Sequence, residues 1–159
     1  MRRRAILLIA VAATALALVM GAALATLPSG TTPTPLTRAT LENFEAHNDA
    51  IEVESERHSA DAAIVKVVIE PGGSTCWHHH PGVALVAIKS ETFTEYDAKC
   101  EKSIYKAGKG FVESNDEVHL VRNHSKADAV LYVTFIVPTS TSPEGLLIDE
   151  PRPKGCNAR

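Results

Sequence analysis

Hydrophobic and polar positions alternate, or gather into short apolar runs, throughout the region from residue 62 to residue 138. The runs are rich in β-branched and aromatic residues, and glycine, proline or short polar stretches separate them, as is typical of β-strands. The strand candidates are AAIVKVVIE (62–70), VALVAIK (83–89), TFTEYD (92–97), KSIYKAGKG (102–110), EVHLVRN (117–123) and AVLYVTFIVP (129–138). Strands that recur about every 8–12 residues, without a convincing helical period, predict an all-β sandwich or barrel.

Local signals refine this outline. Pro71-Gly72-Gly73 predicts a turn after the first strand candidate, and Ser90-Glu91 predicts a tight hairpin between the second and the third. The segment from Leu41 to His47 could form one short helical turn.

The two flanks differ from this region in composition. Residues 26–42 are rich in Pro, Thr and Ser and have little apolar periodicity, which predicts an extended linker. Residues 139–159 hold three prolines and predict a loop-like tail, in which GLLID (145–149) could form a last edge strand. The predicted domain therefore covers residues 43–138.

The first 25 residues have the pattern of a targeting segment. Arg2-Arg3-Arg4 precedes an uncharged run of 21 residues from Ala5 to Ala25, and Ala23-x-Ala25 is the small-residue pattern that a signal peptidase accepts. We interpret residues 1–25 as a cleaved signal peptide, with an uncleaved membrane anchor at residues 5–25 as the alternative. Either interpretation places the domain outside the cytoplasm.

Charge narrows the range of partners. The chain has 16 Lys and Arg against 19 Asp and Glu, and loss of the three leader arginines leaves 13 against 19, a balance of −6. No basic patch interleaved with aromatic residues is present in the sequence, which argues against a nucleic-acid partner. The acidic balance also argues against docking on an anionic membrane, so membrane contact is expected only through an uncleaved leader.

Three consecutive histidines in CWHHHPG (76–82) form the main candidate site. Because side chains alternate along a strand, Cys76, His78 and His80 should share one face, and Trp77 and His79 the other. Two imidazoles at positions i and i+2 can bind one ion, and the third ligand must then come from another strand.

His119 is the candidate third ligand, and here the chain resembles the cupin superfamily. Gly72-x5-His78-x-His80 is similar to the start of the first cupin motif, and Gly108-x10-His119-x3-Asn123 to the glycine, histidine and asparagine of the second. The likeness spans residues 62–138 and is greatest to small secreted single-domain bacterial cupins. It implies a cupin-type β-barrel (jelly roll) with His78, His80 and His119 as metal ligands.

The chain departs from the first motif at the carboxylate. The glutamate that usually follows the second histidine is replaced by Ala84 or Leu85, so no carboxylate stands at the expected place. Glu113 and Glu117 could approach the mouth of the pocket and act as an acid or a base, but we interpret each as a solvated charge. Asn123 is either a site residue or a cap at the end of its strand.

Three neutral imidazoles suit a divalent transition metal, and ligand type alone does not choose among Zn, Fe, Ni and Cu. The alternative is that His78 and His80 are polar residues in a metal-free pocket. His79 and His124 are interpreted as surface residues, and Trp77 as a core or interface residue on the opposite face.

Export makes the three cysteines informative, because an oxidising compartment allows two of them to pair. Cys100 and Cys156 both lie in polar, loop-bounded stretches, and the resemblance implies cysteines at similar places in related secreted cupins. The expected disulfide therefore joins Cys100 to Cys156 and attaches the C-terminal tail to the barrel. Cys76 is then a buried small hydrophobe, with a role as a soft metal ligand as the alternative.

Two classes of function remain. The first is an exported binding module that holds a metal and a small molecule without turnover, and the absence of a clear base favours it. The second is a metal-dependent cupin enzyme, a dioxygenase or an isomerase. For either class, a second copy of the chain is a possible partner, in a homodimer.

Overall fold

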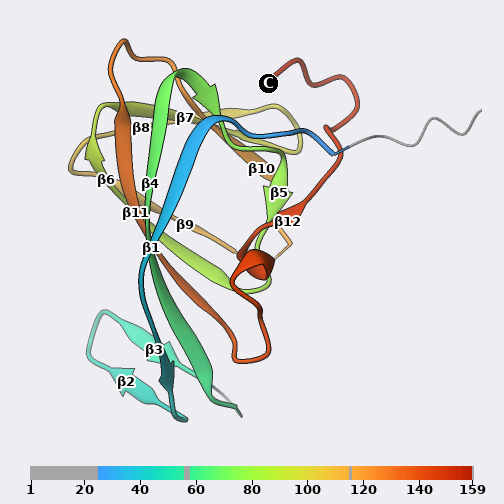
Figure 1. Ribbon diagram of the computed structural model, residues 1–159. Helices are drawn as coiled ribbons and strands as arrows, with labels where there is room; N and C mark the ends of the chain where they lie inside the picture. The colour runs from blue at the N-terminus through green and yellow to red at the C-terminus, as the bar shows by residue number, and fades with distance from the viewer. Residues whose placement is uncertain (1–24, 56–57, 115, 159) are drawn as a thin grey trace, which may run out of the picture.

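The computed structural model describes residues 25–55, 58–114 and 116–158, in which it has twelve strands and one 3-10 helix (Figure 1). The strands are β1 (Ser29–Leu41), β2 (Glu45–His47), β3 (Glu52–Glu54), β4 (Ala60–Ser74), β5 (His78–His79), β6 (Val83–Ser90), β7 (Thr92–Asp97), β8 (Lys102–Lys106), β9 (Gly110–Glu113), β10 (His119–Asn123), β11 (Ala129–Pro138) and β12 (Ile148–Asp149). The helix is η1 (Glu144–Leu146). The predicted leader lies outside the described residues except for Ala25. Within those ranges, no helix has the length and apolar character needed to cross a membrane.

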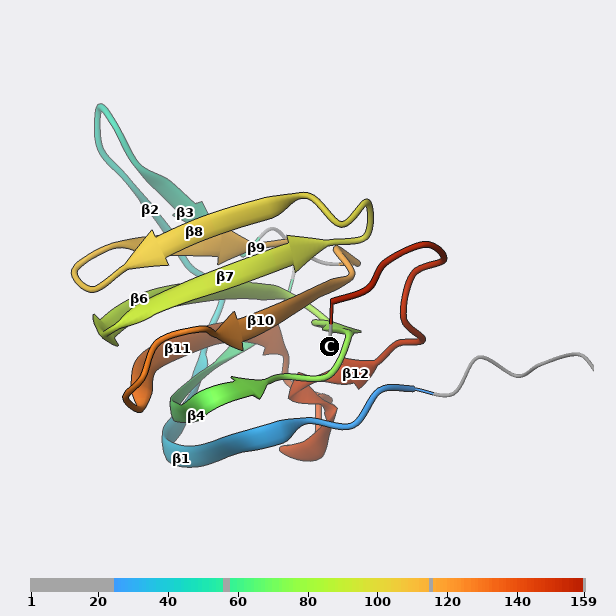
Figure 2. The same cartoon turned by 90° about the horizontal axis from the view of Figure 1, so that it is seen from above.

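One ten-stranded antiparallel sheet folds into a barrel, and its two halves face each other as two smaller sheets (Figure 2). One has the order β1-β4-β11-β6-β9, and the other has the order β12-β5-β10-β7-β8. A single pair, Arg122 with Ser74, joins β10 to β4 and closes one side. The prediction of an all-β jelly-roll barrel is confirmed.

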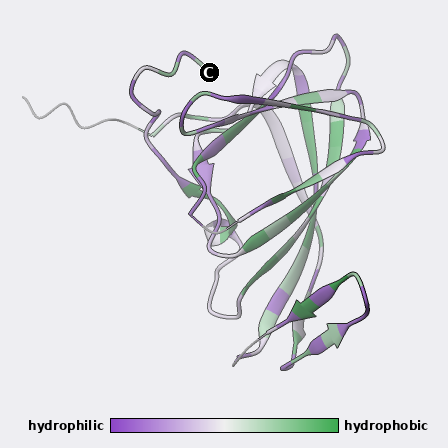
Figure 3. Cartoon of the chain, turned by 180° about the vertical axis from the view of Figure 1, so that it is seen from behind, coloured by the Kyte–Doolittle hydropathy of each residue, from purple (hydrophilic) through white to green (hydrophobic). Residues whose placement is uncertain are grey.

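The main core lies between the inner faces of these sheets. In β6, Ala84, Val86 and Ile88 are buried, whereas Leu85 on the outer face is 45% exposed. The apolar run of this strand is thus covered on one face only. Apolar residues are concentrated along the barrel strands, and the loops at their ends are mostly hydrophilic (Figure 3).

A smaller core lies on the outer side of β10, under the C-terminal tail. It contains Trp77, Tyr96, Leu120 and Cys156, and the side chain of Trp77 is fully buried. Trp77 therefore packs on the face opposite His78, as strand alternation predicts.

The predicted linker is a strand. β1 pairs with β4 from Ser29 opposite Ser74 to Leu41 opposite Ala60, in the same sheet as the rest of the barrel. Prolines are tolerated in β1 because it is an edge strand, where one row of backbone groups needs no partner. The predicted helical turn is also wrong, since β2 forms a small hairpin with β3 there.

The predicted hairpin at Ser90-Glu91 is a corner. Glu91 has a φ of 64°, a left-handed conformation suited to an abrupt turn. β6 pairs with β11 and β9, whereas β7 pairs with β10 and β8, so the chain crosses from one sheet to the other. The sequence signal for a turn was right, and the pairing inferred from it was wrong.

Gly82 allows the chain entering β6 to pass close to β11. A Cβ atom at this position would overlap the carbonyl oxygen of Ile136 and lie 3.1 Å from Cα of Val137. We expect Gly82→Ala to lower the free energy of unfolding in urea by about 1–3 kcal/mol, because backbone atoms must shift. Gly145→Ala is the control, since it meets only side chains of Ser142 and Thr141. Equal stabilities of the two variants would contradict this reason.

Candidate metal centre

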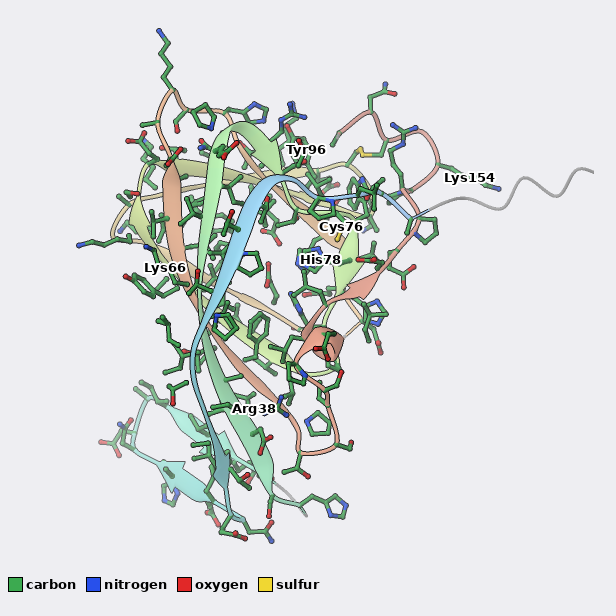
Figure 4. All side chains as sticks on the ribbon, in the orientation of Figure 1. Arg38, Lys66, Cys76, His78, Tyr96 and Lys154 are labelled. Atoms are coloured by element: carbon green, nitrogen blue, oxygen red, sulfur yellow. A yellow bond between two sulfur atoms is a disulfide. The ribbon has the colours of Figure 1, made fainter. Side chains whose placement is uncertain are left out.

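Strand register brings the three predicted histidines together. His78 in β5 lies directly opposite His119 in β10, and His80 follows two residues later on the same face as His78. Their candidate ligand atoms all lie within 4.8 Å of one another, and each residue is at most 4% exposed. The ring centroids are 4.3 Å apart for His78 and His119, and 4.8 Å apart for His78 and His80. In Figure 4, His78 lies beside β5 at the side of the barrel next to the tail.

Backbone carbonyls orient all three rings. The Nδ1 atom lies 2.8 Å from the Cys76 oxygen in His78, 2.7 Å from the Leu146 oxygen in His80, and 2.7 Å from the Glu117 oxygen in His119. A carbonyl oxygen only accepts, so each Nδ1 donates and carries the proton. In a neutral ring the lone pair then lies on Nε2, the atom that faces the cluster, and hydrogen bonds of this kind orient histidine ligands at metal sites.

Glu113 completes the cluster. It is the last residue of β9, is 5% exposed, and lies with Oε2 3.1 Å from Nε2 of His80 and Oε1 3.0 Å from Nε2 of His119. The interpretation of Glu113 as a solvated charge is wrong. Glu117 is exposed, as expected, and its carboxylate accepts a hydrogen bond from the Ser114 amide.

The converging atoms are electron-rich. Nε2 of His119 is buried and, among the described residues, has no hydrogen-bond partner, although Glu113 is within ion-pair distance. Nitrogen lone pairs and carboxylate oxygens at about 3 Å repel one another unless a proton or a metal ion lies between them. Three imidazole nitrogens and one carboxylate oxygen form a donor set that suits a divalent transition metal.

Charges within the cluster also favour a cation. Burial, with the neighbouring His119 and His80, lowers the pKa of His78 to about 3, so this ring stays neutral. Burial alone would raise the pKa of Glu113, but the adjacent imidazoles of His119 and His80 outweigh it and lower the pKa to about 2. Burial likewise opposes protonation of His119, but the Glu113 carboxylate outweighs it and raises the pKa of His119. The ionised carboxylate thus attracts positive charge to the cluster.

Cys76 lies beside the cluster without joining it. Its Sγ donates a hydrogen bond to Oδ1 of Asp149 at 3.1 Å, and burial followed by this contact raises the pKa of the thiol to about 12. A neutral thiol is a poor metal ligand, because the thiolate is the form that binds metals. The structure therefore agrees with the interpretation of Cys76 as a buried side chain.

The disulfide between Cys100 and Cys156 is confirmed, with the two Cα atoms 5.5 Å apart. It attaches the tail to the β7–β8 connection. Upstream of this bond, β12 pairs with β5, with Asp149 opposite His78, and the tail supplies the carbonyl that holds His80. The tail is thus part of the scaffold of the candidate centre.

The other predicted positions lie outside the cluster. His79 is half-buried rather than fully exposed, and its Nδ1 lies 2.9 Å from a carboxylate oxygen of Glu150. His124 is exposed and contacts the Tyr96 hydroxyl. Asn123 donates hydrogen bonds to the carbonyls of Ile69 and Ala127, so it caps the end of its strand.

A cavity of about 380 Å³ adjoins the histidines inside the barrel. His78, His80 and Glu113 form part of its wall, and aliphatic residues of β4 and β11 form much of the rest. Cavities of this size are typical of sites for small molecules, which occupy about 300–1,000 Å³.

No protein-family model and no curated protein sequence matches the chain. The chain is similar to a double-stranded β-helix protein of Klebsiella pneumoniae, with a TM-score of 0.48 and 16% identity, over 55% of this chain and 73% of that one. It is similar to a cupin domain of Bordetella pertussis, with a TM-score of 0.48 and 18% identity, over 70% and 97% of the two chains. An oxalate oxidase matches with a TM-score of 0.43 and 21% identity, over 46% and 41%.

The structure itself shows an antiparallel β-barrel. In this barrel the carboxylate of the candidate centre comes from a different strand than the resemblance to the first cupin motif implies. Glu113 of β9 lies directly across from Ala84 of β6, one of the two positions at which the motif places its glutamate. The neighbouring strand thus supplies the acid that β6 lacks.

Proposed function

We propose that this chain is an exported cupin-domain protein that binds one divalent transition metal and holds a small molecule in the adjoining cavity. His78, His80 and His119 are the histidine ligands, and Glu113 is the fourth. The observation that carries the proposal is the shared orientation of the rings, since every Nδ1 is bound to a carbonyl and the ligand atoms gather near the Glu113 carboxylate. When bound, the metal would supply Lewis-acid or redox chemistry.

Elemental analysis tests the proposal directly. The protein should be purified without a nickel column, stripped of metal, incubated with Zn²⁺ or Fe²⁺, and freed of unbound ions. We expect about one ion per chain, because the ligands are already oriented for binding. Less than about a tenth of an ion per chain with every metal tried would count against a metal centre.

Glu113→Gln should weaken metal binding at least about tenfold, because the amide removes the negative charge and offers only a weaker, neutral oxygen donor. Competition with a chromophoric chelator measures the affinity. Glu117→Gln is the matched control, since this nearby carboxylate is exposed and outside the cluster. Equal affinities of the Glu113→Gln variant and the wild type would show that the carboxylate is not a ligand.

A metal-dependent enzyme, a dioxygenase or an isomerase, is the second candidate. It is favoured by the position of the cavity, because a molecule inside it would contact His78, His80 and Glu113 directly. Oxygen consumption after anaerobic loading with Fe²⁺, measured across a panel of substrates, separates a dioxygenase from a binding module.

Export is part of the proposal. The disulfide between Cys100 and Cys156 indicates an oxidising setting, and the sequence of residues 1–25 has the pattern of a signal peptide. N-terminal sequencing of the protein recovered from the medium or the periplasm tests both export and cleavage after Ala25.

A further inference from the structure

The cavity wall is mainly apolar beyond the histidines and a few acidic and hydroxyl residues. The inner faces of β4, β6 and β11 contribute apolar side chains to it, including those of Val65, Val67, Val86, Leu131, Val133 and Phe135. The apolar wall begins at the metal centre itself, since the ring centroids of Phe135 and His80 are 5.1 Å apart. A ligand that reached the metal with one polar group would bury the rest of its surface against hydrocarbon.

The rim of the cavity is also largely apolar. Pro33 and Pro35 of β1 stand on one side of it, and Pro143 and Leu147, which flank η1, stand on the other. β1 and the segment around η1 lie along the same side of the barrel (Figure 2). Proline has no N–H to donate, so these positions offer few hydrogen bonds to a polar ligand.

The charges around the cavity are all of one sign. Among the described residues that line it, none is Lys or Arg, whereas Glu113, Glu144 and Asp149 carry carboxyl groups. An anionic ligand would have no cationic side chain to pair with, and burial of an unpaired charge is costly. Away from the metal, the wall therefore selects against carboxylate, phosphate and sulfonate groups.

We infer that the cavity takes a mainly apolar small molecule that presents a single polar group to the metal and carries no charge elsewhere. The inference rests on the proposed function only for that polar group, because the apolar wall and the absence of cationic lining residues among the described residues do not depend on a metal. It names the class of ligand for both the binding module and the enzyme.

Two dyes that share a ring skeleton test the inference on metal-free protein. N-phenyl-1-naphthylamine is uncharged, 8-anilinonaphthalene-1-sulfonate carries one sulfonate, and both fluoresce more strongly in apolar surroundings. We expect the uncharged dye to bind at least about tenfold more tightly, since the sulfonate would be buried without a partner. Equal or tighter binding of the sulfonate, or no binding of the uncharged dye, would overturn the inference.

Substitutions at two neighbouring valines of β4 test whether the dye binds inside the cavity. Val67 lines the cavity, and Val68 is on the opposite face of the strand. Val67→Phe should weaken binding of the uncharged dye at least about tenfold by filling the cavity, whereas Val68→Phe should leave it within about twofold. Equal weakening by both would mean that the dye binds elsewhere.

A substitution at the rim of the cavity tests the effect of charge on dye binding without changing the packing of the cavity wall. Glu144 is exposed on the rim, so Glu144→Lys should leave folding intact, as circular dichroism will verify. The ratio of the dissociation constants of the sulfonated and the uncharged dye should fall at least about threefold, because the new lysine adds a cation near the sulfonate. An unchanged preference would contradict the charge argument. The same metal-free protein is then loaded with Zn²⁺, so failure to bind metal is read separately from failure to bind dye.

Discussion

Replacing His119 with alanine should reduce the bound metal from about one ion per chain to less than about a tenth, because the ion loses the only histidine that comes from β10. His78 and His80 come from one short segment and cannot surround an ion by themselves. The removed nitrogen is also a buried atom for which no hydrogen-bond partner is found among the described residues. Elemental analysis after loading with one equivalent of Zn²⁺ and gel filtration measures the loss.

His79→Ala is the matched control for this experiment. It removes an imidazole from the same HHH segment, but one that faces away from the cluster and pairs with Glu150. This variant should keep about one ion per chain. Retention of metal by His119→Ala, or equal loss in both variants, would refute the assigned ligand set.

Breaking the disulfide should have the largest effect on stability. Cys100→Ser and Cys156→Ser should each lower the free energy of unfolding by about 4 kcal/mol, because either change releases a loop closed across a separation of 56 residues. Guanidinium unfolding, with the midpoint and the slope both fitted, measures the change.

Equal losses of unfolding free energy in the two cysteine variants would show that the cross-link, and not local packing, causes the effect. Cys156 is buried beside Trp77, whereas Cys100 is only partly buried, so a packing effect alone would make the losses unequal. Wild-type protein treated with a dithiol reductant should unfold at the same denaturant concentration as the variants. A stable reduced protein would indicate that the tail is held without the bond.

Strand periodicity predicted much of the candidate site. Alternation alone placed Cys76, His78 and His80 on one face and Trp77 on the other, because side-chain direction along a strand depends only on local geometry. The resemblance to the cupin motifs added His119, and the structure brings it to the other two histidines.

Pairing between distant strands could not be predicted in the same way. Glu113 follows Phe111 and Val112 in a short strand, and no local signal distinguishes it from the other acidic residues. Its position depends on the register between β9 and β6, which places it opposite Ala84. Register is set by tertiary packing, which a single sequence shows only indirectly.

Edge strands were missed for a related reason. The Pro- and Thr-rich segment was interpreted as a linker because proline weakens the usual strand pattern, yet β1 pairs along most of β4. Similarly, the turn at Ser90-Glu91 was visible in the sequence, but whether its strands pair with each other or enter separate sheets was not.

The C-terminal extension determines where the domain can be shortened. A chain cut after Pro138, at the end of the last long strand, would keep all four candidate ligands. It would lose the Leu146 oxygen that fixes His80 and the two-residue strand opposite His78 and His79. It would also lose the Glu150 amide that donates to the Trp77 carbonyl. Boundaries for recombinant expression should therefore extend at least to Cys156, since a truncated barrel would retain the ligating residues without the framework that aims them.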